Sequence, residues 1–401
     1  MRQQPGLVVD KDLGDTPGLH AFVIGISQYP YLPSQNEPPR RAQFGLRSVD
    51  GPALSAWRLA RMLKSPPANA SWVQPLRTLR VLLLPSAADA EDPVAKAAKF
   101  DDWVGPVPDL ATVRQVATAW QADCERSDRE AALFYFAGHG LRLDADCLVL
   151  AGFGKDADEA NPSLSGCCPL DKFMQGMFAR PGQAMAREQF WFVDACRTQI
   201  NPELLGQVIL PERLLSIRLG DGQDLRQFGV QATGQGIAAL SLPGQAGTAF
   251  GSALLNGLTG AVGKSVPWPL GVPEARAAWP VNIPDLLEAI KSQLGANPVT
   301  KGQRPGLLGA GGNGPLILHM EPPSIPIRLD VSPSRMPASV TEVKLERRNG
   351  NPAYLKNLRA LKPCPYSDTV PAGYYDVQWT SAGKRCNDTW FASLASGDLL
   401  L

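Results

Sequence analysis

Short, uninterrupted apolar runs recur along the first 320 residues of the chain. Runs of this kind are typical of parallel strands that are buried on both faces of a sheet. Between them lie longer segments with apolar residues at helical spacing, the first of which begins at Asp50 as its expected N-cap. The strand segments are 20–27, 79–84, 131–137, 146–151 and 190–193, and the helical segments are 50–63, 107–124 and 169–178. Their alternation predicts an α/β sheet, mostly parallel, with helices on both faces.

The pattern changes close to Pro322-Pro323. Before that point the later segments are strands at 229–233, 237–242 and 315–320 and helices at 249–260 and 283–294. After it, apolar and polar residues alternate in stretches at 325–331, 340–346 and 373–380, which is the pattern of half-buried strands. We therefore expect an N-terminal tail over 1–18, an α/β domain over 19–320 and a small all-β, sandwich-like domain over 322–401.

Composition and charge exclude several classes of protein. The net charge is +1 and 19% of the residues are charged, so no surface suited to nucleic acid is expected. No apolar run approaches the roughly 20 residues of a membrane helix, and the N-terminus lacks the apolar core of a signal peptide. These features predict a protein without a membrane or nucleic-acid partner, in the cytoplasm.

The seven cysteines favour a reducing compartment over a disulfide framework. Their number is odd, their spacing is irregular, and none forms a Cys-x-x-Cys motif. The neighbours Cys167 and Cys168 are the only pair that suggests zinc, and no second pair or nearby histidine completes a ligand set. We expect no metal and no cofactor.

Two strand segments end in residues with reactive side chains. One runs Ala131-Ala-Leu-Phe-Tyr-Phe-Ala-Gly-His-Gly140, and the other runs Phe190-Trp-Phe-Val-Asp-Ala-Cys-Arg-Thr198. Because the carboxyl ends of parallel strands share one edge of a sheet, His139 and Cys196 are expected to meet there. A cysteine beside an imidazole is a candidate nucleophile with its base. The other two histidines, His20 and His319, are more simply explained as structural residues.

These two motifs resemble those of the caspase and metacaspase group of cysteine proteases. Caspases place the histidine about 50 residues before a cysteine in Gln-Ala-Cys-Arg-Gly. Here the cysteine motif reads Asp194-Ala-Cys-Arg-Thr198, which is similar to the Asp-x-Cys of the metacaspase-like, bacterial branch. The resemblance implies a caspase-like fold and a cysteine endopeptidase, with a role in defence or cell death.

The resemblance also implies roles for other residues. The backbone N–H groups of Gly140 and Cys196 would form the oxyanion hole, and Asp194 would bind a basic substrate side chain, arginine before lysine. From the residues alone, Asp194 has a second interpretation as a strand-end acid that pairs with Arg197. A second pocket acid of the family has no match, because the segment after the first strand reads Ser27-Gln28-Tyr29. No residue stands out as a third member that orients the imidazole.

The interval 199–228 is polar and rich in breaks, like the activation linker of the family. Its arginines, Arg213, Arg218 and Arg226, are the candidate sites of self-cleavage. The expected partner of the chain is a protein or peptide substrate, with a further partner protein at the C-terminal β domain. The alternative is a catalytically silent scaffold with the caspase fold, and the presence of both His139 and Cys196 argues against it.

Overall fold

The computed structural model divides the chain into two compact units. The first comprises 1–66, 72–255 and 294–314, and the second comprises 67–71, 256–293 and 315–401. The expected segment 322–401 falls within the second unit, which also takes in 256–293 from the expected α/β domain. The structure describes residues 5–68, 70–157, 163–200, 211–218, 225–232, 247–261, 266–267, 277–310, 314–319, 324–330, 340–347, 355–359, 366–371, 373–381, 384–392 and 399–400.

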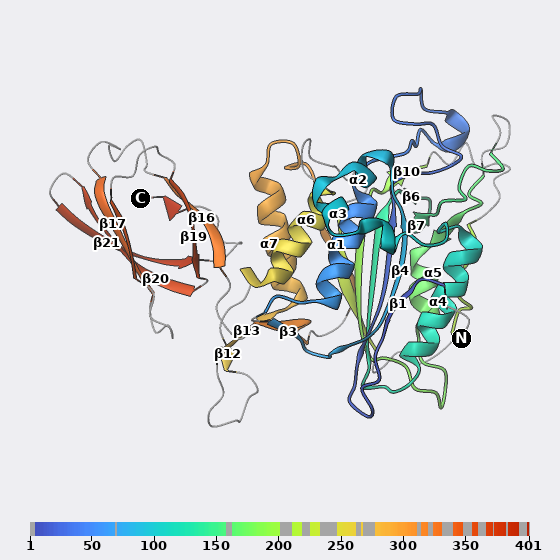
Figure 1. The fold of residues 1–401 in the computed structure, drawn as a ribbon, viewed down its shortest axis with the longest axis horizontal. Helices are drawn as coiled ribbons and strands as arrows, with labels where there is room; N and C mark the ends of the chain where they lie inside the picture. Colours follow the sequence, from blue (N-terminus) through green and yellow to red (C-terminus); the bar gives the residue numbers. More distant parts are fainter. Residues whose placement is uncertain are drawn as a thin grey trace. The chain divides into compact units, whose positions relative to one another are not determined.

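A seven-stranded sheet forms the centre of the first unit (Figure 1). Its order is β1 (Leu7–Asp10), β4 (Leu76–Leu84), β2 (Leu19–Ile26), β5 (Ala131–Gly138), β9 (Glu188–Ala195), β11 (Arg226–Gln231) and β14 (Gly306–Ala310). The strands from β4 to β11 run parallel, and β1 and β14 are antiparallel at the edges. Every residue of β2 and β5 is buried, which explains their unbroken apolar sequences.

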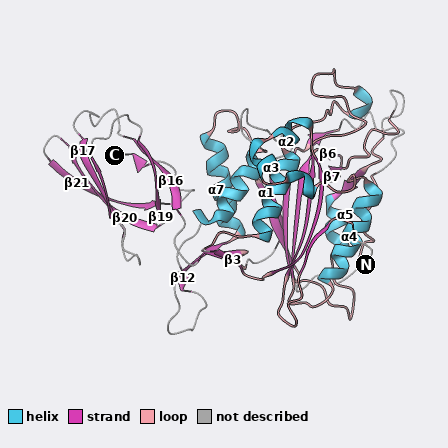
Figure 2. Cartoon of the chain, viewed as in Figure 1, coloured by secondary structure: helices cyan, strands magenta, loops and turns pink. Residues whose placement is uncertain are grey.

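Helices cover both faces of this sheet (Figure 2). One face carries α1 (Pro52–Lys64) and α6 (Ala249–Asn256), and the opposite face carries α4 (Leu110–Cys124) and α5 (Leu170–Gly176). The same unit also contains α2 (Ala87–Glu91), α3 (Pro93–Ala97) and the 3₁₀ turn Phe100–Trp103. Gly25 lets α1 approach β2 closely, since a Cβ there would lie 2.5 Å from the Cβ of Ala56. On the other face Trp120 of α4 packs against Phe22 and Trp191. The α/β prediction is therefore confirmed at this level.

The expected N-cap of α1 was wrong by one residue. Gly51 is the N-cap, with φ of 104°, and Pro52 opens the helix. The turn at Gly51 directs its N–H to the carboxylate of Asp89, at 2.8 Å. A left-handed conformation of this kind favours glycine over Asp50 at the cap. By contrast α4 begins with a side-chain cap, in which Asp109 accepts from the N–H of Thr112.

A small sheet follows the strands that carry the predicted dyad. Its order is β10 (Thr198–Gln199), β6 (Gly140–Arg142), β7 (Asp146–Val149) and β8 (Cys167–Pro169). β10 pairs in parallel with β6, so the segment after Cys196 lies beside the segment after His139. This pairing fixes the two chain segments that leave the carboxyl edge of the large sheet.

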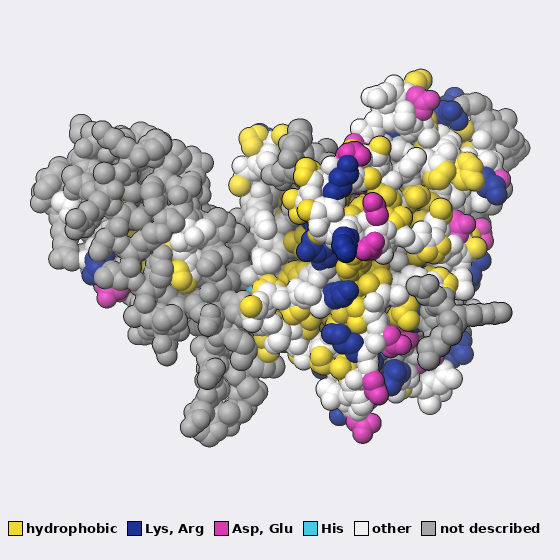
Figure 3. Space-filling model, in the orientation of Figure 1, with side chains coloured by type: hydrophobic (Ala, Val, Ile, Leu, Met, Phe, Trp, Pro, Cys, Tyr) yellow, Lys and Arg dark blue, Asp and Glu magenta, His cyan; other side chains and the backbone are white. Residues whose placement is uncertain are grey.

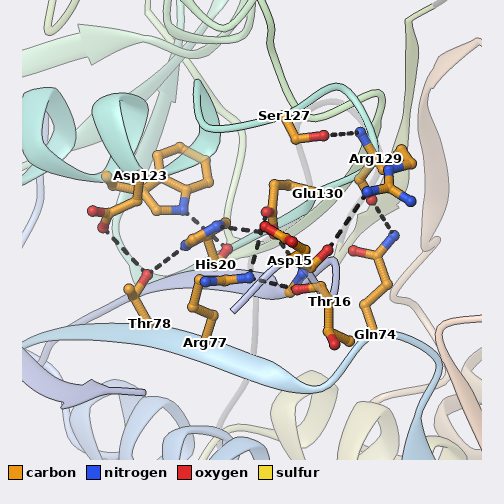
Figure 4. Close-up of polar contacts among 12 residues, drawn as sticks. Asp15, Thr16, His20, Gln74, Arg77, Thr78, Asp123, Ser127, Arg129 and Glu130 are labelled. Carbon is orange, nitrogen blue, oxygen red and sulfur yellow. Dashed lines mark hydrogen bonds and ion pairs between the residues drawn. The ribbon is translucent and has the colours of Figure 1, made fainter. Parts of the chain in front are cut away.

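A buried polar network lies at the opposite, amino edge of the strands (Figure 4). His20 contacts Thr78 Oγ1 at 2.8 Å and Glu130 at 3.3 Å, and no surface of the imidazole is exposed. Burial and the nearby Arg77 lower the pKa of His20 to about 3. Arg77 also donates to the carbonyls of Gly14 and Thr16. His20 is therefore a neutral structural residue, and Arg77 anchors the N-terminal segment.

The second unit contains helical elements and small, separate sheets. One sheet has the order β12 (Val266–Pro267), β13 (Ala277–Val281), β15 (Ile317–His319) and β3 (Ala70–Trp72), and the helical elements are the π turn Gly257–Ala261 and α7 (Ile283–Ala296). Two more sheets hold β19 (Tyr366–Pro371), β16 (Ser324–Asp330) and β22 (Leu399–Leu400), and β18 (Leu355–Arg359), β17 (Val340–Arg347), β20 (Gly373–Ser381) and β21 (Lys384–Ala392). The expected strand over 237–242 lies outside the described residues.

The surface carries charges of both signs. On the face drawn in Figure 3, basic side chains are interspersed with acidic and apolar ones. Among the described residues, no helix is long and apolar enough to span a bilayer.

Candidate active site

Two neighbouring strands of the large sheet bring the predicted nucleophile and base to the same edge. Gly138 at the end of β5 and Ala195 at the end of β9 are register partners in a parallel pair. His139 and Cys196 therefore leave adjacent strands at the same level, where the loops of a parallel sheet converge. His139 is 9% exposed and Cys196 is partly exposed. The geometry places the two predicted residues together.

The thiol of Cys196 has an environment that favours its ionised form. Burial opposes ionisation, but hydrogen bonding to His139 and the charge on its ring outweigh it, and the pKa of Cys196 falls from 9.0 to about 7. Thr198 Oγ1 lies 3.5 Å from Sγ and donates to it. In the protonated state, the thiol reaches the carbonyl oxygen of Gly140 at 3.4 Å.

The imidazole of His139 is oriented by a backbone carbonyl. Its Nε2 forms a hydrogen bond with the carbonyl oxygen of Arg47, in the loop between β2 and α1. A carbonyl can only accept, so Nε2 carries the proton and the neutral ring keeps its lone pair on Nδ1. The Arg47 carbonyl thus orients the imidazole, for which the sequence offered no candidate. Sequence reasoning missed it because every residue has such a carbonyl.

Tyr29 holds the backbone of His139 through a hydrogen bond. Its hydroxyl accepts from the N–H of His139 at 2.9 Å and donates to the carbonyl of Val149 at 3.3 Å. The two rings lie 4.9 Å apart between centroids. Burial raises the pKa of Tyr29, so the hydroxyl stays protonated and able to donate. Tyr29 follows β2, and its hydroxyl bonds to the backbone of the histidine.

Glycines flank His139 because the backbone is crowded on both sides. A Cβ at Gly138 would lie 2.7 Å from the hydroxyl of Tyr29. A Cβ at Gly140 would lie 2.1 Å from the carbonyl oxygen of Cys196. Real Cβ atoms do not approach oxygen so closely, so both positions require glycine. The backbone of Gly140 consequently lies directly against the backbone of Cys196.

Asp194 is a buried residue of β9, two residues before Cys196, with 1% of its surface exposed. Its Oδ2 accepts from the hydroxyl of Tyr135 at 2.9 Å and from the hydroxyl of Thr248. Oδ1 is buried and has no hydrogen-bond partner among the described residues. Burial raises the pKa of Asp194 to about 6, although the hydroxyls of Thr248 and Tyr135 and the backbone N–H of Gly251 favour the carboxylate. A buried carboxyl with one unoccupied oxygen results.

Arg197 is engaged elsewhere, which removes the alternative that it pairs with Asp194. Its guanidinium forms two bonds with Asp146, from Nε at 2.8 Å and from Nη2 at 2.7 Å. Arg142 binds the same carboxylate at 3.0 Å. These pairs join the turn after Cys196 to β6 and β7 of the small sheet.

The three arginines proposed for self-cleavage have different surroundings. Arg218 is buried and pairs with Glu125, and it also donates to the carbonyl of Phe178. Arg226 begins β11 and is hydrogen-bonded within the sheet. Arg213 is exposed in an irregular segment. Arg213 is therefore the site most open to a protease.

The described residues contain no group of three His, Cys, Asp or Glu side chains that could hold a metal ion. Cys167 and Cys168 are buried on β8, and burial raises the pKa of both thiols. A raised pKa disfavours the thiolate that metals bind.

No protein-family model matches this sequence, and the search of curated proteins returned no match. The resemblance to caspases therefore rests on the two sequence motifs.

Proposed function

We propose that this chain is a cysteine endopeptidase with His139 and Cys196 as its catalytic dyad. The observation that carries the proposal is the ionisable thiol of Cys196 beside an imidazole whose tautomer is set by the carbonyl of Arg47. With its pKa near 7, about half of the thiol is ionised at neutral pH, against a few per cent for an ordinary cysteine. A nucleophile and an oriented base are thus available in the folded chain.

The reaction follows from the protonation states of the pair. Nδ1 of His139 takes the proton of the Cys196 thiol, and the thiolate attacks the carbonyl carbon of the scissile peptide. A C–S bond forms, and the oxyanion is stabilised by the N–H groups of Gly140 and Cys196. The imidazolium then gives its proton to the departing amine as the C–N bond breaks. Water, deprotonated by His139, cleaves the thioester and regenerates the thiol.

Substrate preference is proposed to rest on Asp194. Its Oδ1 is the acceptor available to a basic side chain, and a guanidinium or ammonium there would balance the buried charge. Because the carboxyl is 1% exposed, a substrate cation reaches it only when the covering side chains move. Arginine is expected to be preferred over lysine because its planar fork offers more donors.

We also infer the finer architecture from the fold described above. The mostly parallel sheet with helices on both faces supports a caspase-like arrangement of the first unit. The two C-terminal sheets, β19-β16-β22 and β18-β17-β20-β21, support a small sandwich that binds a partner protein. The rival function is a catalytically silent scaffold.

A fluorogenic peptide panel tests the proposed function. Peptides with Arg, Lys or Asp before the scissile bond are incubated with the wild type, Cys196→Ala, His139→Ala and the double variant. Each single variant should lose about 10³-fold or more, and the double variant should be no worse, because the two residues act as a unit. Cys124→Ala is the matched control, since Cys124 is fully buried and burial raises the pKa of its thiol.

Two results would contradict the proposal. If Cys196→Ala kept most of the wild-type activity, Cys196 would not be the nucleophile. The second result is a wild type that cleaves neither the peptides nor any protein offered as substrate, while a partner binds equally to the wild type and to Cys196→Ala. In that case a catalytically silent scaffold would be the better description.

A further inference from the structure

Thr198 is placed against the reacting sulfur by the chain's own geometry. Its hydroxyl oxygen lies 3.5 Å from Sγ of Cys196. Within the described residues the hydroxyl has no other hydrogen-bond partner. A thiolate carries no proton, so once the sulfur is ionised the hydroxyl must be the donor of this bond. A donor aimed at a charge stabilises it more than it stabilises the neutral thiol.

Two features hold Thr198 in this position. First, β10 pairs in parallel with β6, with Thr198 opposite Leu141, and Ile200 N–H continues the ladder to the carbonyl of Arg142 at 2.9 Å. Second, Arg197, which stands between Cys196 and Thr198, is tied by two bonds to Asp146. The Arg197 and Asp146 side chains are 17% and 20% exposed, so the pair is partly shielded from water. The turn is therefore fixed on both sides of Thr198.

We propose that Thr198 is a catalytic residue of this site, whose hydroxyl donates to the thiolate of Cys196 and is held in place by the β10–β6 pairing and the Arg197–Asp146 ion pair. The role in peptide cleavage rests on the proposed function, but the stabilisation of the thiolate does not. A hydroxyl donor of this kind complements the imidazole, because it donates to the negative charge that the sulfur carries once His139 has taken the thiol proton.

The ionisable groups around the sulfur are few enough for a clean titration. Among the residues that the structure describes, they are His139 after β5, Tyr29 after β2 and the Arg197–Asp146 pair. Tyr29 stays neutral, because burial raises its pKa. The ion pair is left intact by changes at Thr198. A shift in the titration of Cys196 on removal of the hydroxyl is therefore attributable to the lost hydrogen bond.

The experiment is the pH dependence of alkylation of Cys196 by iodoacetamide, which reports the thiolate directly. The product is followed by mass spectrometry on the tryptic peptide that ends at Arg197, so the other cysteines do not contribute. The variants are Thr198→Val, which removes the hydroxyl at nearly constant volume, and Thr198→Ser, which keeps it. Thr118→Val is the control, because the Thr118 hydroxyl bonds only to the α4 carbonyl of Arg114 among described groups. His139→Ala gives the reference for a large shift.

We expect Thr198→Val to raise the alkylation midpoint by about half to one pH unit and to lower the rate at pH 7 about threefold. Thr198→Ser and Thr118→Val should titrate like the wild type. Thermal melting checks that each variant is folded. An unchanged midpoint in Thr198→Val would overturn the proposal, and so would equal shifts in the valine and serine variants, since these would point to packing. If the shift is seen but no peptide is cleaved by the wild type, Thr198 stabilises the thiolate and the endopeptidase proposal fails alone.

Discussion

Replacing Asp194 with asparagine should change how the stability of the protein depends on pH. The carboxyl is buried, and its pKa rises from 3.8 to about 6 on folding. Between these two values the unfolded chain has lost the proton and the folded chain retains it, so stability falls as pH rises. The difference corresponds to about 3 kcal/mol, at 1.36 kcal/mol for each unit. This stability is fully present below about pH 4 and is lost as pH rises through 6.

The measurement is urea unfolding of the wild type and Asp194→Asn at several pH values from about 4 to 8. The quantity of interest is the difference in free energy of unfolding between the two proteins, because the fixed cost of burying an amide cancels in its pH dependence. We expect this difference to change by about 3 kcal/mol in favour of the variant between pH 4 and 7. Asp102→Asn, at an exposed position, controls for the loss of one carboxylate.

A second variant should shift the pH at which this stability is lost instead of abolishing the pH dependence. Tyr135 donates to Oδ2 and so favours the ionised form of Asp194. Tyr135→Phe should raise the pKa of Asp194 further and move the loss of stability to higher pH. Parallel pH profiles for the wild type and Asp194→Asn would refute the reasoning, because they would mean that the carboxyl is solvated in the folded protein. Conversely, a midpoint near 6 implies that preference for arginine substrates strengthens above that pH.

Three further changes probe the site. Tyr29→Phe removes the acceptor of the His139 N–H, and should lower kcat/KM about 10-fold and stability by about 1–2 kcal/mol, measured by peptide hydrolysis and urea unfolding. Gly140→Ala places a methyl group against the Cys196 carbonyl, and should abolish activity and lower the melting temperature, as overpacking costs about 1–3 kcal/mol. Arg213→Gln should prevent any self-cleavage at the exposed segment, as seen by intact-mass spectrometry.

The tyrosine and glycine changes each have a control in the same chain. Tyr31→Phe removes a hydroxyl from a 42%-exposed ring, and Gly105→Ala adds a methyl group with no atom within 4 Å, so both should behave like the wild type. Cleavage after the buried Arg218 in preference to Arg213 would show that the segment opens before it is cut. Full activity in Gly140→Ala would contradict the close packing of Gly140 against Cys196.

The placement of His139 and Cys196 together was predictable because its signals are local. An apolar run followed by Gly138-His139-Gly140, and another followed by Cys196, identify strand ends without knowledge of the fold. The partners of these residues were not predictable. Arg47 contributes only a carbonyl, and the side chains that hold Asp194 are 59 and 54 residues away in sequence. Contacts between residues so far apart in sequence depend on which strands pair with one another. The pattern of any single segment does not predict strand pairing.

The prediction of Asp50 as the N-cap of α1 was wrong for a similar reason. Local preference favours an acidic N-cap, but the chain must turn sharply into Pro52, and Gly51 makes the turn with φ of 104°. A side chain from elsewhere in the chain satisfies the first helical turn, because Ser27 Oγ accepts from the N–H of Ala53 at 2.9 Å. Backbone geometry imposed by the fold here overrode a preference that holds for isolated helices.

The same side chains behave differently at the two edges of the sheet, and this supports the choice of catalytic residues. At the amino edge, burial and the positive charge of Arg77 lower the pKa of His20 to about 3, so it cannot exchange protons near neutrality. At the carboxyl edge, His139 has a carbonyl on Nε2 and a thiol whose pKa it lowers to about 7. Burial raises the pKa of the Cys124 thiol instead. A nucleophilic cysteine needs a base and donors that offset its burial, and among the described cysteines only Cys196 has a lowered pKa.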